Sequence, residues 1–320
     1  MQITVVGCGV SGLTTSVELQ SRGHCVRIVA RELPHDCVSV VAGAIWGPTS
    51  VEPRHRTGPW SLVSRERFAA LAELPDTGVA PMVHLDLHRD SAPHWSEDLP
   101  WVTRVGPEHC PPGYPAALRI DGFRIDPPTY LQWLLDRFEA GGGTITLEAV
   151  PSLEGLEGEV IVNCSGLGAV ELVGDSSMFP IRGQMVLVDN SDQIGDGISD
   201  ETDQDRISYV YPRTRHLYLG GARQIGDDRT KVDPALTERI LADAPRLDPR
   251  VTGRAVDDVR VGLRPGRPEV RLEATTLADG RPLIHNYGHS GAGYIMSWGC
   301  AAEVADLADM AGATATGSEV

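Results

Sequence analysis

Residues 2–12 read QITVVGCGVSG, and this stretch decides the fold. Its first part, 2–8, is apolar and rich in β-branched residues, which is typical of a buried parallel strand. The next segment, 11–22, has apolar residues at helical spacing and ends before Gly23, a residue suited to a helix C-terminus. Residues 25–30 then predict a second strand. Together they form a β-α-β unit of about 30 residues, the length that a parallel crossover needs.

The turn between this strand and helix has the pattern Gly-x-Gly-x-x-Gly, at Gly7, Gly9 and Gly12. In this pattern the first glycine permits a tight turn, the second lets the backbone approach a pyrophosphate, and the third permits close helix–strand packing. The helix N-terminus, with Val10 and Ser11, adds N–H donors and a partial positive charge that favour phosphate. We therefore predict a dinucleotide-binding loop.

The end of the second predicted strand leaves the kind of dinucleotide open. An acidic residue that binds a ribose is usual at that place. Here Ala30 and Arg31 occupy it, and Glu32 comes one position later. We expect Arg31 to face the adenosine or phosphate side of the cofactor. The loop alone does not decide between FAD and NAD.

Composition excludes several classes of protein. A chain of 320 residues with 41% hydrophobic residues is expected to fold around a sizeable core. Its formal charge of -16 weighs against nucleic acids and anionic membranes, which attract positive surfaces. No apolar run approaches the roughly 20 residues of a membrane span, and no signal peptide is evident at the N-terminus.

The cysteines and histidines predict neither disulfides nor a metal site. The six cysteines form no C-x-x-C pair, and their spacing fits no zinc site or disulfide framework. Reduced thiols are usual in the cytosol, so we expect a cytoplasmic protein. His285 and His289 lie four positions apart, but no third ligand accompanies them in the sequence, so we expect no metal.

Six further segments carry a resemblance to a known family. They are VAGAIWGP (41–48), VNCSGLGA (162–169), PIRGQ (180–184), YVYPR with LGG (209–213, 219–221), VGLRPGRPEVRLE (261–273) and HNYGHSGAGYIMSWGCA (285–301). In these segments, which span the chain in the family's order, the sequence resembles the D-amino acid oxidase family, which also contains D-aspartate oxidases. The resemblance implies FAD as the cofactor.

The resemblance and the order of predicted elements imply two interleaved domains. We expect an α/β fold in which a Rossmann-like FAD-binding domain is interleaved with an α+β substrate domain built on a large, mostly antiparallel sheet. The FAD-binding domain is predicted at residues 1–50, 118–182 and 269–320. The substrate-binding domain is predicted at residues 51–117 and 183–268. The oligomeric state is left open, with a homodimer as one expectation.

The resemblance assigns substrate-binding roles to three residues. Arg264 matches the arginine that holds the substrate carboxylate in a fork, and a planar guanidinium suits that task. Tyr209 matches the tyrosine that donates to the same carboxylate, and Gly291 the glycine whose carbonyl accepts from the amine. From the residues alone, Arg264 also fits a surface ion pair. Tyr211 competes with Tyr209, because strand alternation puts both on one face.

The resemblance also implies which residues contact the cofactor. The loop at 43–45 matches the flavin side, and segments 163–166 and 288–295 match backbone contacts. The residues concerned are Gly43, Ala44, Ile45, Asn163, Gly166, Gly288, His289, Ser290, Gly293, Tyr294 and Ile295. A Gly-rich turn that opens a helix offers N–H donors to the C2 carbonyl side of a reducing flavin.

The reaction that the resemblance implies is oxidative deamination of D-amino acids. A hydride passes from the substrate Cα to flavin N5, oxygen takes the electrons as hydrogen peroxide, and the imine hydrolyses to a 2-oxo acid and ammonia. Orientation would supply most of the catalysis. The implied partners are a small D-amino acid and oxygen, with no nucleic acid and no membrane.

Departures from the family keep alternatives open. Gly47 stands where larger side chains are common, so the pocket is expected to be wider there. The lid-like stretch 190–206 is acidic and has no tyrosine. Arg223 stands where D-aspartate oxidases carry an arginine for the side-chain carboxylate, but it also fits a surface strand end. The alternatives are a D-aspartate or D-glutamate oxidase, a glycine or N-methyl amino acid oxidase, and a flavin-binding protein without turnover.

Overall fold

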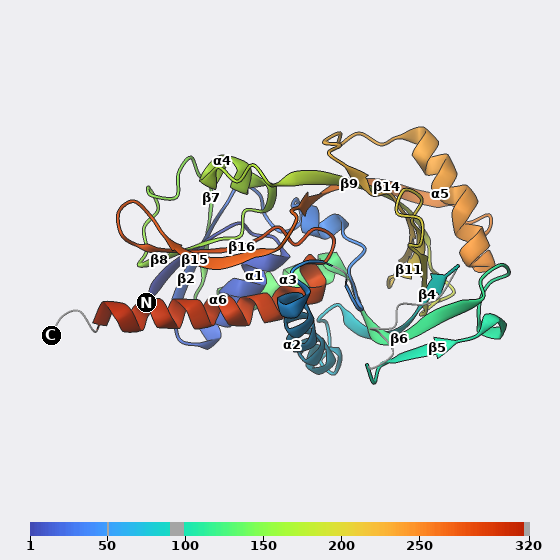
Figure 1. The fold of residues 1–320 in the computed structure, drawn as a ribbon, viewed down its shortest axis with the longest axis horizontal. Helices are drawn as coiled ribbons and strands as arrows, with labels where there is room; N and C mark the ends of the chain where they lie inside the picture. Colours follow the sequence, from blue (N-terminus) through green and yellow to red (C-terminus); the bar gives the residue numbers. More distant parts are fainter. Residues whose placement is uncertain (50, 90–98, 317–320) are drawn as a thin grey trace.

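Two β-sheets form the framework of the protein (Figure 1). The structure is a computed structural model that describes residues 1–49, 51–89 and 99–316. One sheet has six strands and the other has ten, and they occupy opposite ends of an elongated molecule (Figure 1). The chain passes between them several times, so each sheet is built from distant segments.

The six-stranded sheet holds the predicted β-α-β unit. In spatial order its strands are β15 (Arg271–Thr276), β16 (Pro282–Tyr287), β8 (Val160–Asn163), β1 (Gln2–Val6), β2 (Cys25–Ala30) and β7 (Thr144–Leu147). All neighbours are parallel except β15 and β16. Strand β8 is buried throughout, as expected for a parallel strand covered on both faces.

Helices cover this sheet and enclose the largest core. Helix α1 (Val10–Ser21) packs against both α3 (Pro127–Ala140) and α6 (Gly293–Thr316), and α2 (Arg54–Ala72) packs against α6. The predicted first helix is therefore confirmed to within a residue at each end. Strand β1 ends at Val6 because Gly7 turns the chain with a φ of 107°.

The ten-stranded sheet is mostly antiparallel, as predicted. Its main path is β13 (Gln224–Ile225), β9 (Phe179–Asp189), β12 (His216–Gly220), β11 (Ser208–Pro212), β10 (Gly197–Asp200), β4 (Val79–His88), β6 (Ala116–Ile125) and β3 (Ile45–Trp46). Strand β14 (Val256–Gly266) pairs with β9, and β5 (Val102–Val105) pairs with β6. Within this sheet, β10 and β4 form the only parallel pair among the strands that the structure describes.

One face of the ten-stranded sheet is covered by helix α5 (Pro234–Leu247). Its buried residues Ile240, Ala244 and Leu247 pack in one cluster with strand residues such as Val186 and Val210. The opposite face carries a separate cluster of tyrosines, to which Tyr209 and Tyr211 belong. The two faces therefore differ in chemistry: one is an aliphatic core and the other is rich in hydroxyl groups.

Sheet membership and helix packing differ from the predicted domain boundaries at several places. Strands β3 and β6 lie in the ten-stranded sheet, although residues 1–50 and 118–182 were assigned to the FAD-binding domain. Helix α2 packs against α6, although residues 51–117 were assigned to the substrate-binding domain. The division of the chain into two domains stays a prediction. Across the described residues, no helix has the length and apolar character needed to span a membrane.

Candidate active site

Tyr209 is buried on strand β11, and its surroundings are shaped by two glycines. Its ring stacks on that of Tyr211, with 4.3 Å between centroids and 10° between planes, so the two tyrosines share a face as predicted. A Cβ on Gly220 would lie 2.0 Å from Tyr209 Cζ, and one on Gly221 would lie 2.6 Å from Cε1. Burial raises the pKa of Tyr209, against the opposing effect of Arg264, so the hydroxyl remains a donor at neutral pH.

Arg264 lies on β14, half-buried, with its guanidinium over a glycine. A Cβ on Gly183 would lie 2.6 Å from Arg264 Nη1, so the guanidinium would have to move if this glycine carried a side chain. Nη1 donates to the carbonyl of Ala222 at 3.0 Å. Within the described part of the chain, no carboxylate forms an ion pair with Arg264. The alternative considered from sequence, in which Arg264 serves only in a structural ion pair, therefore explains this residue poorly. The remaining N–H donors suit a planar anion.

Gly291 lies beside the Arg264 side chain. A Cβ on Gly291 would be 3.7 Å from Arg264 Cδ. The segment from Gly220 to Ala222 then links the arginine to Tyr209, because it touches the tyrosine ring at one end and accepts from the guanidinium at the other. The structure thus brings the three predicted substrate-binding residues to one place, while their roles remain predictions.

This place adjoins the turn that follows strand β8 of the six-stranded sheet. Gly166, which follows β8, has a φ of 58°, and a Cβ there would lie 3.7 Å from Pro265, the neighbour of Arg264. The chain that precedes α6 approaches from the other side, since Ser290 N donates to Pro265 O at 3.0 Å. The end of β14 therefore joins the two sheets at the predicted site.

The glycine loop has the shape of a dinucleotide cradle. A Cβ on Gly7 would lie 2.6 Å from Cys164 O, and one on Gly12 would lie 2.0 Å from Gly7 O, so neither position accepts a side chain. Gly9 is the N-cap of α1, and the first N–H of the helix, that of Val10, donates to Ser39 Oγ at 3.0 Å. The next N–H groups of the first turn lie at the loop, which suits a phosphate.

Two orphaned polar groups lie next to this cradle. Asn163 Nδ2 and Ser165 Oγ are buried and have no hydrogen-bond partner in the part of the chain that the structure describes. Both lie close to the loop, since a Cβ on Gly7 would be 3.5 Å from Ser165 Cα. Buried polar atoms rarely stay unpaired. A polar ligand at the carboxyl end of β1 and β8 would satisfy them, so these residues fit a dinucleotide.

His289 ties the turn before α6 to the start of α1. Its Nε2 is 3.0 Å from Asn286 Oδ1, and its Nδ1 is 3.4 Å from Ser11 Oγ. Burial lowers the pKa of His289 to about 4, so the ring is neutral at physiological pH. His285 has a different partner, Thr275 Oγ1 at 3.0 Å. No group of three metal-ligating side chains occurs in the described ranges.

The loop at 43–45 packs against the tyrosine face. A Cβ on Gly43 would lie 3.4 Å from Tyr211 Cδ2. Ala44 has a φ of 40°, and its carbonyl accepts from Ile125 N at 2.9 Å and from Arg213 Nη2 at 3.2 Å. Ile45 packs against the cluster that contains Tyr209. This loop therefore borders the site on the side opposite Arg264's sheet partner β9.

Of the other residues predicted to contact the cofactor or the substrate side chain, some lie at the start of α6 and others lie at the surface. Tyr294 donates from its hydroxyl to Ser39 O at 2.8 Å, and a Cβ on Gly293 would be 3.7 Å from Val10, so the start of α6 adjoins α1. Arg31, in contrast, is 74% exposed and pairs with Glu32 at 3.3 Å. Arg223 is exposed. A Cβ on Gly47 would meet nothing within 4 Å, so this position has room.

Remaining predicted positions lie where the same turn and helix begin. Gly288 has a φ of 81° and Ser290 a φ of 51°, so the turn needs left-handed backbone at both residues. Ile295 packs partly buried against the largest core. Sequence reasoning missed Gly183, Gly220 and the carbonyl of Ala222, although Gly183 lies in the PIRGQ segment. A backbone acceptor carries no signal in side-chain chemistry.

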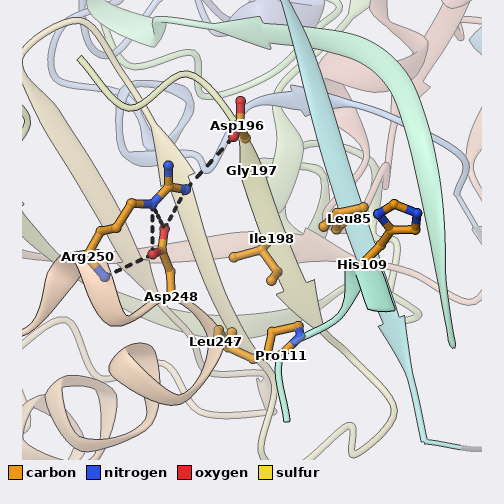
Figure 2. Close-up of a pocket in the computed structure, with 9 residues that line it drawn as sticks. All are labelled: Leu85, His109, Pro111, Asp196, Gly197, Ile198, Leu247, Asp248 and Arg250. Carbon is orange, nitrogen blue, oxygen red and sulfur yellow. Dashed lines mark hydrogen bonds and ion pairs between the residues drawn. The ribbon is translucent and has the colours of Figure 1, made fainter. Parts of the chain in front are cut away.

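A pocket of about 200 Å³ lies away from this site. Figure 2 shows it between Leu85, Ile198 and Leu247, with Arg250 bonded to Asp248 at its rim. Ile198 and Leu85 pack in the aliphatic cluster under α5, which is the face opposite Tyr209. The pocket therefore belongs to the packing of α5 rather than to the predicted chemistry.

Comparison with known proteins identifies the family to which this chain belongs. Residues 2–307 match the family model described as FAD dependent oxidoreductase. A D-amino-acid oxidase from Rubrobacter xylanophilus is 44% identical over 312 residues, covering 96% of this chain and 95% of that protein. The chain belongs to the FAD-dependent oxidoreductase family. FAD is therefore its cofactor, which answers the question that the glycine loop left open.

Two more distant proteins accompany this match. A D-aspartate oxidase from Homo sapiens is 32% identical over 325 residues, covering 96% of this chain and 94% of that protein. The crystal structure of a glycine oxidase from Bacillus cereus superimposes with a TM-score of 0.80 at 18% identity, covering 97% of this chain and 95% of that chain. At that identity the likeness shows the fold alone. The resemblance noted from sequence and the fold class are both confirmed.

Proposed function

We propose that this FAD-dependent oxidoreductase oxidises D-amino acids to imino acids, which hydrolyse to 2-oxo acids and ammonia. The observation that carries the proposal is the guanidinium of Arg264, which has no carboxylate partner in the described chain and lies beside Tyr209 and Gly291. An arginine without its anion at the junction with a dinucleotide cradle suits an anionic substrate next to the cofactor. The name of the bacterial relative supports the choice of D-amino acids.

The first step is capture of the substrate carboxylate. Arg264 would bind both oxygens with parallel N–H donors, and Tyr209 would donate its hydroxyl to one of them. Because Ala222 O and Gly183 hold the guanidinium in place, little side-chain freedom is lost when the substrate binds. These contacts fix one end of the substrate.

The second step is orientation of the Cα–H bond. The carbonyl of Gly291 would accept a hydrogen bond from the neutral amine, so that carboxylate and amine together define which way Cα–H points. When bound, FAD supplies the hydride acceptor, and oxygen then takes the electrons as hydrogen peroxide. An L-enantiomer held by the same contacts would direct its Cα–H away from the acceptor. A neutral amine needs no protein base.

The residues that would hold FAD surround the glycine cradle. Gly7 and Gly12 let the loop pack closely on Cys164 and on itself, and the N-terminus of α1 would face the pyrophosphate. Asn163 and Ser165 have the orphaned polar atoms that such a ligand would satisfy. The exposed Arg31, which pairs with Glu32, would lie on the adenosine side.

The test is anaerobic titration of the FAD-loaded protein with about 20 D- and L-amino acids. Bleaching of the flavin absorbance by D-amino acids, and by none of the L-enantiomers, is the expected result, because only a correctly oriented Cα–H transfers its hydride. Admission of air should restore the colour and yield hydrogen peroxide. A flavin that stays oxidised with every D-amino acid would contradict the proposal and favour a binding protein without turnover.

The same titration separates the related activities. Reduction by D-aspartate and D-glutamate alone would favour an acidic-substrate oxidase in which Arg223 binds the second carboxylate, as the exposed side chain of Arg223 permits. Reduction by glycine or N-methyl amino acids alone would favour an oxidase of small amines. The cytoplasmic location and the homodimer remain predictions from sequence.

A further inference from the structure

Glu201, which follows strand β10, lies on the same face of the ten-stranded sheet as Tyr209. The antiparallel register pairs Ser199 with Tyr209 and Asp200 with Ser208, and extending it by one residue beyond the end of β10 places Glu201 opposite Ile207. Side chains alternate along a strand, which places Glu201 on the face of Ser199 rather than on that of Asp200. The stretch 190–206, expected from sequence to be a loop-like lid, thus contains a strand that brings one acidic residue to the site.

Two contacts of neighbouring residues fix the direction of this face. A Cβ on Gly197 would lie 3.5 Å from Tyr211 Cδ1, so odd-numbered residues of β10 point toward the tyrosines. A Cβ on Gly221 would lie 3.4 Å from Ile207 Cδ1 and 2.6 Å from Tyr209 Cε1. The residue opposite Ile207 therefore emerges beside the Gly220–Ala222 segment, which accepts the hydrogen bond from Arg264.

The carboxylate of Glu201 has no partner. In the described part of the chain it takes part in no hydrogen bond or ion pair, and its side chain is exposed. Desolvation by nearby protein atoms nonetheless raises its pKa, with repulsion from Asp86 adding to the rise and attraction from Arg264 and Arg223 opposing it. The charged groups that act on Glu201 therefore include Arg264 and Arg223 of the predicted site.

The other acidic residues nearby are not equivalent. Asp200 points to the opposite face, where Arg89 and the hydroxyl of Tyr114 bind its carboxylate. Asp86 is on the Glu201 face, but it lies 3.5 Å from Ser199 Oγ and 3.3 Å from His88 Nε2. Glu201 is therefore the carboxylate that remains available to a ligand.

The balance of charge changes when a substrate binds. On the proposed function, the substrate carboxylate neutralises Arg264, and Glu201, Asp86 and Arg223 remain as the charges around the substrate side chain. Two carboxylates and one guanidinium leave an excess of negative charge. A cationic group is attracted to such a place, and an acidic one is repelled.

We propose that Glu201 binds the distal ammonium or guanidinium group of the substrate side chain, so that the enzyme prefers basic D-amino acids. This inference rests on the proposed amino acid oxidase activity and gives it a substrate class. It also opposes the acidic-substrate alternative, since an acidic side chain that reached Arg223 would come close to Glu201.

The test compares D-lysine with D-norleucine, which has the same chain length without the ammonium group. In Glu201→Gln, the ratio of kcat/KM for D-lysine over D-norleucine is expected to fall about 10- to 100-fold, as for loss of a hydrogen bond between charged groups. A general disturbance of the site would lower both values and leave the ratio unchanged. Glu238→Gln is the matched control: the same charge is removed from exposed Glu238 on α5, which covers the opposite face, and the ratio should not move.

Each failure has its own signature. If wild-type protein oxidises D-norleucine and the ratio is the same in Glu201→Gln, the role of Glu201 is wrong and the oxidase activity stands. If Asp86→Asn lowers the ratio and Glu201→Gln does not, the cation is bound by the other carboxylate and the assignment is overturned. If neither amino acid reduces the flavin, both the activity and this inference fall.

Discussion

At the scale of single residues, the defining feature of the site is an arginine, Arg264, that has no carboxylate partner in the described chain. Arg264 is held by a backbone carbonyl and a glycine surface, and no carboxylate of the described chain neutralises it. A half-buried guanidinium without an anion is costly in a protein that serves no ligand. A substrate carboxylate would neutralise the guanidinium and offset this cost.

Arg264→Ala should lower kcat/KM for D-amino acids by about 2–5 kcal/mol of transition-state binding, because one partner of a charge pair is removed. Arg264→Lys should recover only part of this loss, since an ammonium group cannot form the fork. Steady-state oxygen consumption measures both. Near-native kcat/KM in Arg264→Ala would show that the carboxylate binds elsewhere; unchanged flavin content is the control for folding.

The choice between the two stacked tyrosines is also a matter of single residues. Tyr209→Phe should lower kcat/KM about 10- to 100-fold, as for one lost hydrogen bond to a charged group. Tyr211→Phe, on the same face, should have a much smaller effect, because Tyr211 lies nearer to Gly197 and Gly43 than to the Arg264 segment. Equal losses in the two variants would mean that the stacked pair acts only as a structural unit.

At the scale of elements, the strand–loop–helix at the N-terminus was predictable, and the short strand β10 was not. Residues 2–22 combine a β-branched run, three spaced glycines and helical periodicity, and the three signals agree. Strand β10 has only four residues, with polar Ser199 and Asp200, inside an acidic stretch. It becomes a strand because β4 and β11 pair with it on both sides. Tertiary pairing of this kind leaves no local pattern.

Helix α2 shows the same limit in another way. This helix begins at Arg54 and includes Pro59. The Trp60 indole donates to Glu303 of α6, and Trp46 donates to the carbonyl of Ser61. These contacts with distant segments stabilise the first turns, which have little amphipathic pattern of their own.

The variant Gly12→Ala tests whether the glycine loop between β1 and α1 binds FAD. Its Cβ would lie 2.0 Å from Gly7 O, so the loop must move and FAD binding should be lost or weakened at least about tenfold. The ratio of flavin to protein absorbance after purification measures this. Gly58→Ala is the control, because a Cβ at Gly58 in α2 meets nothing within 4 Å; it should keep FAD and raise stability by about 0.5–1 kcal/mol. Full FAD content in Gly12→Ala would contradict the assignment.

At the scale of the whole molecule, three buried histidines should make stability depend on pH. Burial lowers the pKa of His84, His285 and His289 to about 4 in the folded protein. In the unfolded chain their pKa is about 6.5. The folded state therefore binds fewer protons between these values, so stability is full above about pH 6.5 and falls as the pH drops toward 4.

When the three imidazole rings titrate together, the free energy of unfolding is expected to change by at most about 4 kcal/mol per pH unit. Urea unfolding at several pH values between 4 and 7.5 measures it. Replacement of His84 by Gln should reduce the slope by about one third, because the other two rings still titrate. A free energy of unfolding that is constant from pH 4.5 to 6.5 would show that the rings are protonated in the folded state.

The six-stranded sheet has a consequence for synthesis on the ribosome. Strand β1 pairs with β8, and β8 pairs with β16, so a strand made at the start depends on partners translated about 160 and 280 residues later. Strand β1 therefore lacks its second neighbour until β8 has emerged, and β8 in turn lacks its second neighbour until β16 has emerged near the end of the chain. Chains stalled before residue 282 should be sensitive to protease, whereas the full-length product released from the same ribosomes should resist digestion.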